Sequence, residues 1–300
     1  MVFSIRSSQA LLAGLALFVS SICIAQVSVK DDLGRDVRLA QAAQRVVSLA
    51  PHNTENLFTA GAGEQVVGTV DHSDFPEQAL DIPRVGNYKQ VNIEAVLALK
   101  PDLIVAWASG NTDESVQRLI DLGIPVFFSE PLTFAQIISN IERLARLTGR
   151  LEDAAPHLAS MRRTYLELQT EYAAKNPLKV FYQVWDHPLI TLNRDHSVSH
   201  AFALCGGVNV FSDEPTIAPR INIEGVISKN PQLILLAGHN ETQSAGWIDS
   251  WSKWPSIDAV STGQVKHIDG DVINRPTQRF FEGTRQICEL IEVARQVNEQ

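Results

Sequence analysis

Candidate side chains for catalysis or metal binding are sparse in this chain of 300 residues. His196 and His200 are four residues apart, a spacing that would place both imidazoles on one helix face, where they could bind a metal ion. No Cys, Asp or Glu completes a ligand set with them, so we interpret them as polar residues at the start of a helix. Ser48, Ser129 and Ser199 lie in no nucleophile elbow. These residues predict neither a metal centre nor a catalytic nucleophile.

Missing motifs and the overall composition exclude further classes of function. The sequence has no Walker phosphate-binding motif and no dinucleotide-binding fingerprint, and we find no general acid–base pair. Asp and Glu number 34 against 25 Lys and Arg, a net charge of −9, which is the opposite of a nucleic-acid-binding surface. A hydrophobic content of 45% over 300 residues suits a globular protein with two domains. We therefore expect no enzyme and no nucleic-acid partner.

The element that organises these domains is clearest in residues 92–107, NIEAVLALKPDLIVAW. Asn92 is a favourable N-cap, and Glu94 lies in the first turn, where negative charge suits the helix dipole. Pro101 ends the helix, and the apolar run LIVAW is typical of a parallel strand covered on both faces. Residues 222–236, NIEGVISKNPQLILL, repeat this pattern in register. The repeat predicts two lobes built on one plan.

Strands and helices alternate along most of the chain, which predicts an α/β fold with parallel sheets. Ligands of such sheets bind beyond the carboxyl ends of the strands, so the loops after Leu49, Val70 and Trp107 form the candidate ligand edge. Two helices replace the alternation over residues 133–176. The second begins at about Leu151 and should span roughly 37 Å, enough to connect one lobe to the other.

The N-terminus predicts a signal peptide over residues 1–25. Arg6 supplies positive charge, residues 10–19 form a short apolar segment, and Cys23-Ile24-Ala25 places small residues before the cleavage site. The apolar segment is too short to span a membrane comfortably. We therefore expect an exported, soluble protein. Lipidation of Cys23 is the alternative.

Cleavage after residue 25 would leave two cysteines, Cys205 and Cys288. Two cysteines in an exported chain predict a disulfide, which would attach the C-terminal helix to the body of its lobe. A loop of this length contributes about 4 kcal/mol at most. The alternative is a pair of buried free thiols.

Four segments carry a family resemblance. They are RVVSLAPHNTE, VNIEAVLALKPDLIVAW, LCGGVNVF and APRINIEGVISKNPQLILL. In this order and spacing they resemble the periplasmic binding proteins of ABC importers for vitamin B12, haem and iron-siderophores, and most of all the cobalamin-binding members. The resemblance spans nearly all of the mature chain.

The resemblance implies the class III fold of these proteins, in which two Rossmann-like α/β lobes are joined by one long rigid helix. Residues 26–131 would form the first lobe, 132–176 the helical segment with the linker helix, and 177–300 the second lobe. It also implies a periplasmic monomer without a cofactor. Such a protein captures cobalamin or a related corrinoid between its lobes and delivers it to an ABC permease dimer with its ATPase.

The resemblance further implies ligand-binding residues. His72, Tyr88 and Trp107 occupy positions where cobalamin binders present aromatic side chains, whose faces suit a corrin ring. His72 stands where Tyr is usual, and Tyr88 where Trp is usual. Asp271 and Arg275 match a polar pair that contacts corrin amides.

Other tryptophans need separate interpretation. Trp185 ends a predicted strand that would face the cleft, and it could replace the family's second-lobe tryptophan, because Ala218 stands at that position. We expect Trp247, Trp251 and Trp254 to pack beneath the C-terminal region.

Glu94 and Glu224 match the acidic residues that dock to permease arginines in this family. An interpretation without any partner is also available, because a first-turn Glu stabilises a helix by about 0.3–1 kcal/mol.

Alternative ligands and functions remain open. A His or Tyr in the cleft could coordinate haem iron, and His72 could coordinate the cobalt of a cobinamide. A ferric siderophore fits less well, since only Arg275 and Lys89 offer positive charge. An exported metal-dependent enzyme would need a ligand cluster in the cleft, whereas the histidines are scattered. A receptor module without a transporter is a further alternative.

Overall fold

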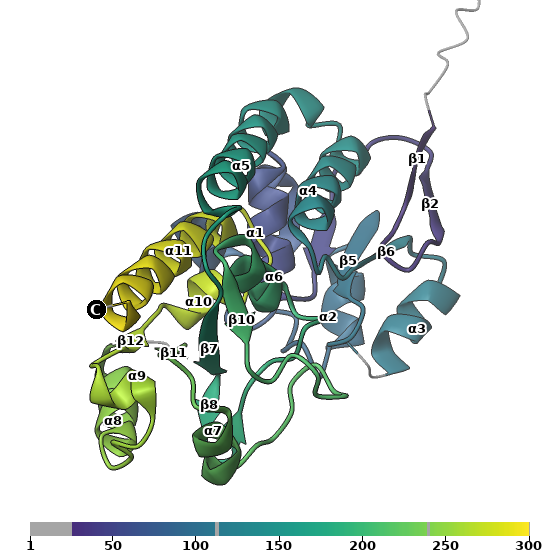
Figure 1. Ribbon diagram of the computed structural model, residues 1–300. Coiled ribbons are helices and arrows are strands. Elements are labelled where there is room, and N and C mark those ends of the chain that lie inside the picture. The colour runs from purple at the N-terminus through teal and green to yellow at the C-terminus, as the bar shows by residue number, and fades with distance from the viewer. Residues whose placement is uncertain (1–25, 112–113, 239–240, 300) are drawn as a thin grey trace, which may run out of the picture.

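The computed structural model describes residues 26–111, 114–238 and 241–299 (Figure 1). The predicted signal peptide, including Cys23, lies outside these ranges. Within them, two four-stranded parallel sheets form the centres of two lobes. The fold is α/β, as the alternating pattern predicts. The division at residues 131 and 176 stays a prediction.

The first sheet has the strand order β4-β3-β5-β6. Its strands are β3 (Val46–Ser48), β4 (Val66–Gly68), β5 (Leu103–Trp107) and β6 (Val126–Ser129). The helices of this lobe are α1 (Pro51–Thr59), α2 (Ile93–Ala98) and α3 (Glu114–Asp121), with short 3-10 turns at Gly63–Gln65 and Glu77–Asp81.

The second sheet has the order β10-β7-β11-β12. Its strands are β7 (Leu178–Gln183), β10 (Gly207–Asn209), β11 (Leu233–Leu236) and β12 (Val265–His267). The helices are α6 (Ser197–Leu204), α7 (Ile223–Lys229), α8 (Glu241–Trp251), α9 (Asp258–Ser261), α10 (Gly270–Ile273) and α11 (Arg279–Asn298). Both sheets place their second strand in the chain at one edge, then the first, the third and the fourth.

The sequence repeat therefore corresponds to a structural repeat. α2 precedes β5 in the first lobe, and α7 precedes β11 at the same place in the second. The Asn92 side-chain oxygen accepts a hydrogen bond from the Ala95 N–H at 3.0 Å, and Asn222 accepts from Gly225 at 2.8 Å. The predicted caps are confirmed in both copies.

The two lobes are joined by α4 (Phe134–Thr148) and α5 (Leu151–Tyr172). The 22 residues of α5 lead from the first lobe to the second, and this helix packs against both α4 and α11 (Figure 1). The ring of Phe134 lies 5.2 Å from that of Phe280 and 5.3 Å from that of Phe281, both in α11. The joint between the lobes is therefore an apolar core, which makes it stiff.

One face of each sheet packs on the core that the two lobes share, and the opposite face packs on a separate core within its own lobe. Val180 and Tyr182 of β7 belong to the shared core, whereas Phe181 between them packs with Trp251, 5.6 Å away. Trp247 lies in the same cluster as Trp251. Trp254 packs against the same cluster, so all three tryptophans are packed as predicted. They lie on the face of the sheet opposite α11, because successive strand residues point to opposite faces.

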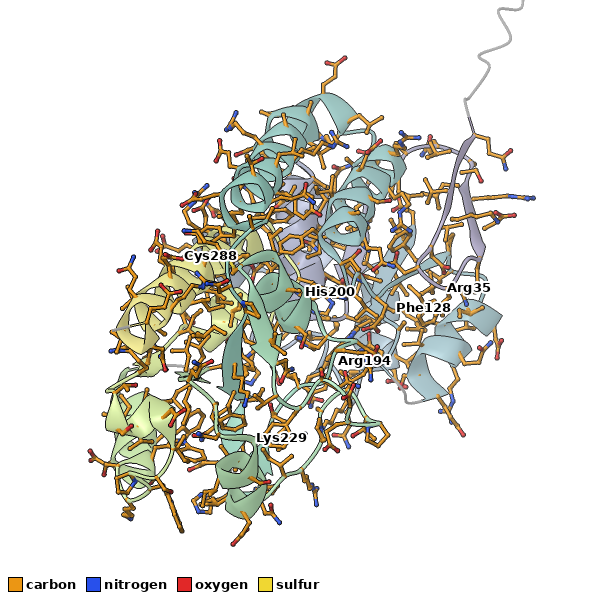
Figure 2. All side chains as sticks on the ribbon, in the orientation of Figure 1. Arg35, Phe128, Arg194, His200, Lys229 and Cys288 are labelled. Atoms are coloured by element: carbon orange, nitrogen blue, oxygen red, sulfur yellow. A yellow bond between two sulfur atoms is a disulfide. The ribbon has the colours of Figure 1, made fainter. Side chains whose placement is uncertain are left out.

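Two hairpins complete the fold. β1 (Val27–Lys30) and β2 (Asp36–Leu39) pair antiparallel, and the Arg35 guanidinium lies 4.2 Å from the centroid of the Phe128 ring, which holds this hairpin against β6 (Figure 2). β8 (Trp185–Asp186) and β9 (Leu189–Ile190) form the second hairpin.

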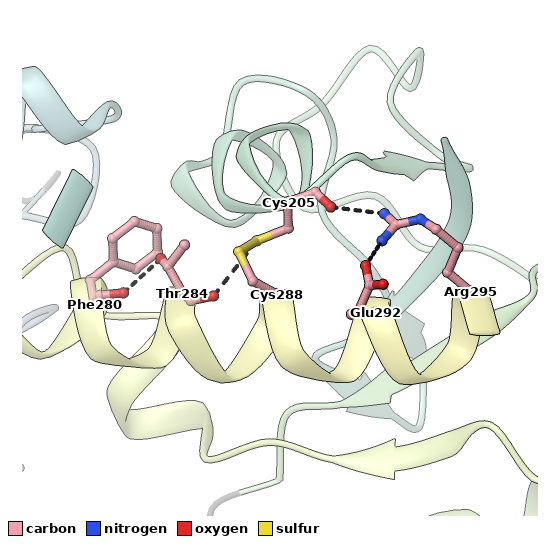
Figure 3. The surroundings of a disulfide bond; sticks show 6 residues. All are labelled: Cys205, Phe280, Thr284, Cys288, Glu292 and Arg295. Carbon is pink, nitrogen blue, oxygen red and sulfur yellow. Dashed lines mark hydrogen bonds and ion pairs between the residues drawn. A yellow bond between two sulfur atoms is a disulfide. The ribbon is translucent and has the colours of Figure 1, made fainter. Parts of the chain in front are cut away.

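The predicted disulfide between Cys205 and Cys288 is present, with 4.8 Å between the Cα atoms (Figure 3). It joins the end of α6 to α11. Arg295, one turn beyond Glu292 in α11, donates a hydrogen bond to the Cys205 carbonyl at 3.1 Å (Figure 3). A covalent bond and a charged hydrogen bond thus attach α11 to its lobe.

Candidate ligand-binding cleft

A cavity of about 460 Å³ lies between the two lobes. Loops of the first lobe line one wall with Pro51, His52, His72, Tyr88, Trp107, Ser109, Glu130, Pro131 and Leu132. The second lobe lines the other wall with His196, Ser197, Ile217, Asn274, Arg275 and Pro276. The predicted ligand edge, formed by the loops after Leu49, Val70 and Trp107, is therefore one wall of this cavity.

Aromatic rings form the first-lobe wall around Trp107. Its ring centroid lies 5.2 Å from that of His52, with the planes at 89°, and 5.7 Å from that of Tyr88, with the planes at 44°. The indole N–H donates to Glu130 Oε1 at 3.3 Å. Such a wall can stack on a flat apolar ligand while keeping one indole edge polar.

Asn111 holds three of these loops together. Its side-chain oxygen accepts a hydrogen bond from the backbone N–H of Trp107 at 2.6 Å. Its side-chain amide donates to the backbone carbonyls of Leu49 at 3.1 Å and Tyr88 at 2.6 Å. Asn111 is buried, so each of these bonds is protected from water. Sequence reasoning missed this residue, because only the fold brings its three partners together.

His52 is not among the residues predicted to bind ligand, but it lines the cavity. It is 6% exposed, and its Nε2 has no hydrogen-bond partner among the described residues. Burial, followed by the nearby positive charge of Arg275, lowers the pKa of His52 to about 3. The imidazole is therefore neutral at pH 7 and retains a free lone pair or N–H.

His72 lies in the loop after β4, with a left-handed backbone at φ 63°. The next residue is held by Arg84, whose guanidinium donates to the Ser73 carbonyl at 2.9 Å. This anchor presents the exposed His72 side chain at the cavity wall.

Arg275 is the charged residue of the second-lobe wall. Its guanidinium contacts Glu55 and Asp74 of the first lobe at 2.9 Å each, and Asp271 of α10 at 3.0 Å. Burial lowers the pKa of Arg275, but its hydrogen bonds to Glu55 and Asp74 outweigh burial and raise it overall. Arg275 therefore carries a permanent charge at the cavity.

The structure brings together four of the residues predicted for ligand binding: His72, Tyr88, Trp107 and Arg275. Asp271 does not line the cavity, but it forms an ion pair with Arg275, which does. Trp185 is not among the lining residues; it is 41% exposed, and its indole N–H donates to the His187 carbonyl at 3.2 Å.

The remaining predicted residues lie elsewhere. Glu94 and Glu224 are exposed in the first turns of α2 and α7. His196 caps α6, since its Nδ1 accepts from the Val198 N–H at 3.2 Å. No group of three potential metal-ligating residues occurs among the residues described by the structure. In the same part of the chain, no helix is both long and apolar enough to cross a membrane.

Comparisons with known proteins agree with this architecture. The family model described as "Periplasmic binding protein" matches residues 46–272. A vitamin B12-binding protein of Vibrio cholerae is 38% identical over 253 residues, covering 84% of this chain and 90% of that protein. One from Yersinia pestis is 35% identical over 250 residues, covering 83% of this chain and 87% of that protein.

Solved structures give the same result. The crystal structure of a periplasmic vitamin B12 binding protein of Vibrio cholerae superposes with a TM-score of 0.78 at 38% identity, over 84% of this chain and 98% of that one. A periplasmic haem-binding protein of Roseiflexus reaches 0.74 at 20% identity, over 85% and 100%, which shows a shared fold alone.

Proposed function

This chain belongs to the periplasmic binding protein family, and we propose that it captures cobalamin or a related corrinoid in its inter-lobe cleft and delivers it to an ABC-type permease. In this role the protein binds and releases its ligand without catalysis and needs no cofactor. It is exported to the periplasm by a cleavable signal peptide over residues 1–25 and docks as a monomer.

The observation that carries this proposal is the aromatic wall around Trp107, facing Arg275 across one cavity. A corrin ring has apolar faces and an edge of amide side chains. Stacking on Trp107 and Tyr88 suits the faces, and the charge of Arg275, with Asp271 behind it, suits amide oxygens. Trp185 does not line this cavity, so it could contact only a part of the ligand that extends beyond the cavity.

In the proposed function, Glu94 and Glu224 are the residues that dock to the permease. Both are exposed, each lies two residues after a cap, and the repeat places them at equivalent positions in the two lobes. Two equivalent acidic residues suit a permease with two equivalent basic sites. Charges at the rim of an interface govern the rate and orientation of association more than its affinity.

Haem is the second candidate ligand, and one observation favours it. Neutral His52, together with His72 and Tyr88, places groups able to coordinate iron in the same cavity. This chain shares its fold with haem-binding proteins.

Titration calorimetry with cyanocobalamin, cobinamide and haemin, combined with absorbance spectra, tests the proposal. We expect one-to-one binding of a corrinoid that Trp107→Ala weakens. Leu166→Ala, at an exposed position of α5 that does not line the cleft, serves as control. Binding of haemin alone, with a Soret shift that His52→Ala or His72→Ala abolishes, would replace this proposal with haem uptake.

A further inference from the structure

A cluster of ion pairs crosses the boundary between the lobes below the cleft. Its centre is Glu55 of α1, whose side chain is 2% exposed. Glu55 Oε1 accepts hydrogen bonds from Arg275 at 2.9 Å and Arg279 at 2.7 Å, and Oε2 accepts from Arg279 at 3.0 Å. Both oxygens of a first-lobe carboxylate thus hold two second-lobe arginines.

The cluster extends to the loop that carries His72. Asp74 of this loop accepts from Arg275 at 2.9 Å, and the Arg279 guanidinium lies 3.9 Å from the centroid of the Phe75 ring. Asp271 accepts from Arg275 at 3.0 Å from the other side. Arg275 lines the cavity, whereas Glu55 and Arg279 do not.

Burying these charges is a poor way to hold the lobes together. A buried ion pair loses its hydration, and an apolar contact of similar size is often as stabilising. The lobes already have such a contact, because Phe134 packs on Phe280 and Phe281. The ion pairs add directional contacts, because charged donors and acceptors in a bidentate arrangement favour one relative orientation of the groups they join.

We propose that Glu55 is a positioning residue, which fixes the Arg275 guanidinium at the cavity wall and, through Arg275 and Arg279, sets the spacing of the two lobes. This inference rests on the function proposed for the cleft. Glu55 itself does not contact the ligand. Loss of its charge would leave two arginines without their shared partner and allow the cleft to widen.

The first test needs no ligand. Nitroxide labels on Glu94→Cys and Glu224→Cys, at one exposed position in each lobe, report the inter-lobe distance by pulsed electron resonance. The protein is produced without residues 1–25, so that Cys23 is absent and Cys205 and Cys288 are protected in their disulfide. We expect Glu55→Gln to broaden this distance distribution. A distribution identical to that of the parent protein would overturn the proposal.

Glu292→Gln is the matched control. Glu292 also pairs with two cations, Lys175 and Arg295, but it does not line the cleft, and both of its partners lie beside Gly206, which follows the disulfide residue Cys205. The same neutralisation should leave the inter-lobe distribution unchanged. A broadening of equal size in both variants would also overturn the proposal, because it would show a general effect of losing an ion pair.

The second test uses cyanocobalamin. We expect Glu55→Gln to accelerate its dissociation about tenfold, because the Arg275 guanidinium would no longer be held in one position at the cavity wall. Glu55→Asp should restore part of the loss, and Glu292→Gln should show the parent rate. Parent-like dissociation from Glu55→Gln would overturn the positioning role.

Two failures can be separated from one another. If the unaltered protein does not bind cyanocobalamin, the proposed function fails, while the spin-label distances still decide the role of Glu55. If Glu55→Gln does not fold, Arg279→Gln replaces it, since this residue is partly exposed and lies outside the cavity. Unchanged distances in Arg279→Gln would then overturn the proposal.

Discussion

The imidazole of His52 meets the indole of Trp107 edge to face, with 5.2 Å between the ring centroids and 89° between the planes. His52 lies in the first turn of α1 and Trp107 is the last residue of β5, so the contact joins a helix start to a strand end at the ligand edge of the first sheet. It fixes the orientation of the largest aromatic surface in the cleft.

Trp107→Ala should weaken cyanocobalamin binding by about 30-fold, equivalent to roughly 2 kcal/mol, because a central aromatic anchor would be lost. Titration calorimetry measures this change. The folded state should survive, since Trp107 is only partly buried. An affinity within a factor of two of the parent value would show that the ligand does not stack on this wall.

His52 should make stability depend on pH. Its pKa in the folded protein is about 3, below the ordinary value of 6.5, so below pH 6.5 the unfolded chain takes up a proton that the folded protein does not. Its contribution is therefore fully present above pH 6.5 and is lost as the pH falls toward 3. His52→Gln should reduce the slope of unfolding free energy against pH by about 1.4 kcal/mol per unit between pH 6 and 4.

Urea unfolding of both proteins at several pH values measures this slope. His196 has a pKa lowered to about 4, chiefly by burial, and contributes with the same sign. The comparison therefore uses the difference between the parent and His52→Gln, in which the His196 contribution cancels. Parallel curves for the two proteins would contradict the buried, neutral state of His52.

Removal of the disulfide should destabilise the second lobe. The double variant Cys205→Ala and Cys288→Ala opens a loop with a sequence separation of 83 residues, and we expect a loss of about 2–4 kcal/mol in the free energy of unfolding. The fold should persist, because Arg295 still donates to the residue 205 carbonyl. Urea unfolding of the variant and of the reduced parent should give similar midpoints.

Charge reversal at Glu94 separates docking from helix stability. Glu94→Lys should slow association with the permease in lipid nanodiscs, with a smaller salt dependence of the rate, because an attractive charge at the rim becomes repulsive. Asn92→Ala removes the helix cap at a cost of about 1 kcal/mol and retains the acidic residue, so it should associate at the parent rate. Equal rates for all three proteins would assign Glu94 to the helix alone.

The sequence by itself determined the elements and their order. The caps at Asn92 and Asn222, the proline that ends each following helix, and the apolar runs of β5 and β11 act within a few residues, so local pattern is enough to predict them. Because parallel strands place their carboxyl ends at one edge, the order of elements also predicted which loops line the cleft.

Only the tertiary structure decided the cluster around Glu55. Glu55 and Arg275 are separated by 220 residues, and no local pattern relates them. The same is true of Asn111, whose partners lie on three different loops. Their roles depend on contacts that exist only after the two sheets have packed on their shared core, whereas caps and strands depend on neighbours in the chain.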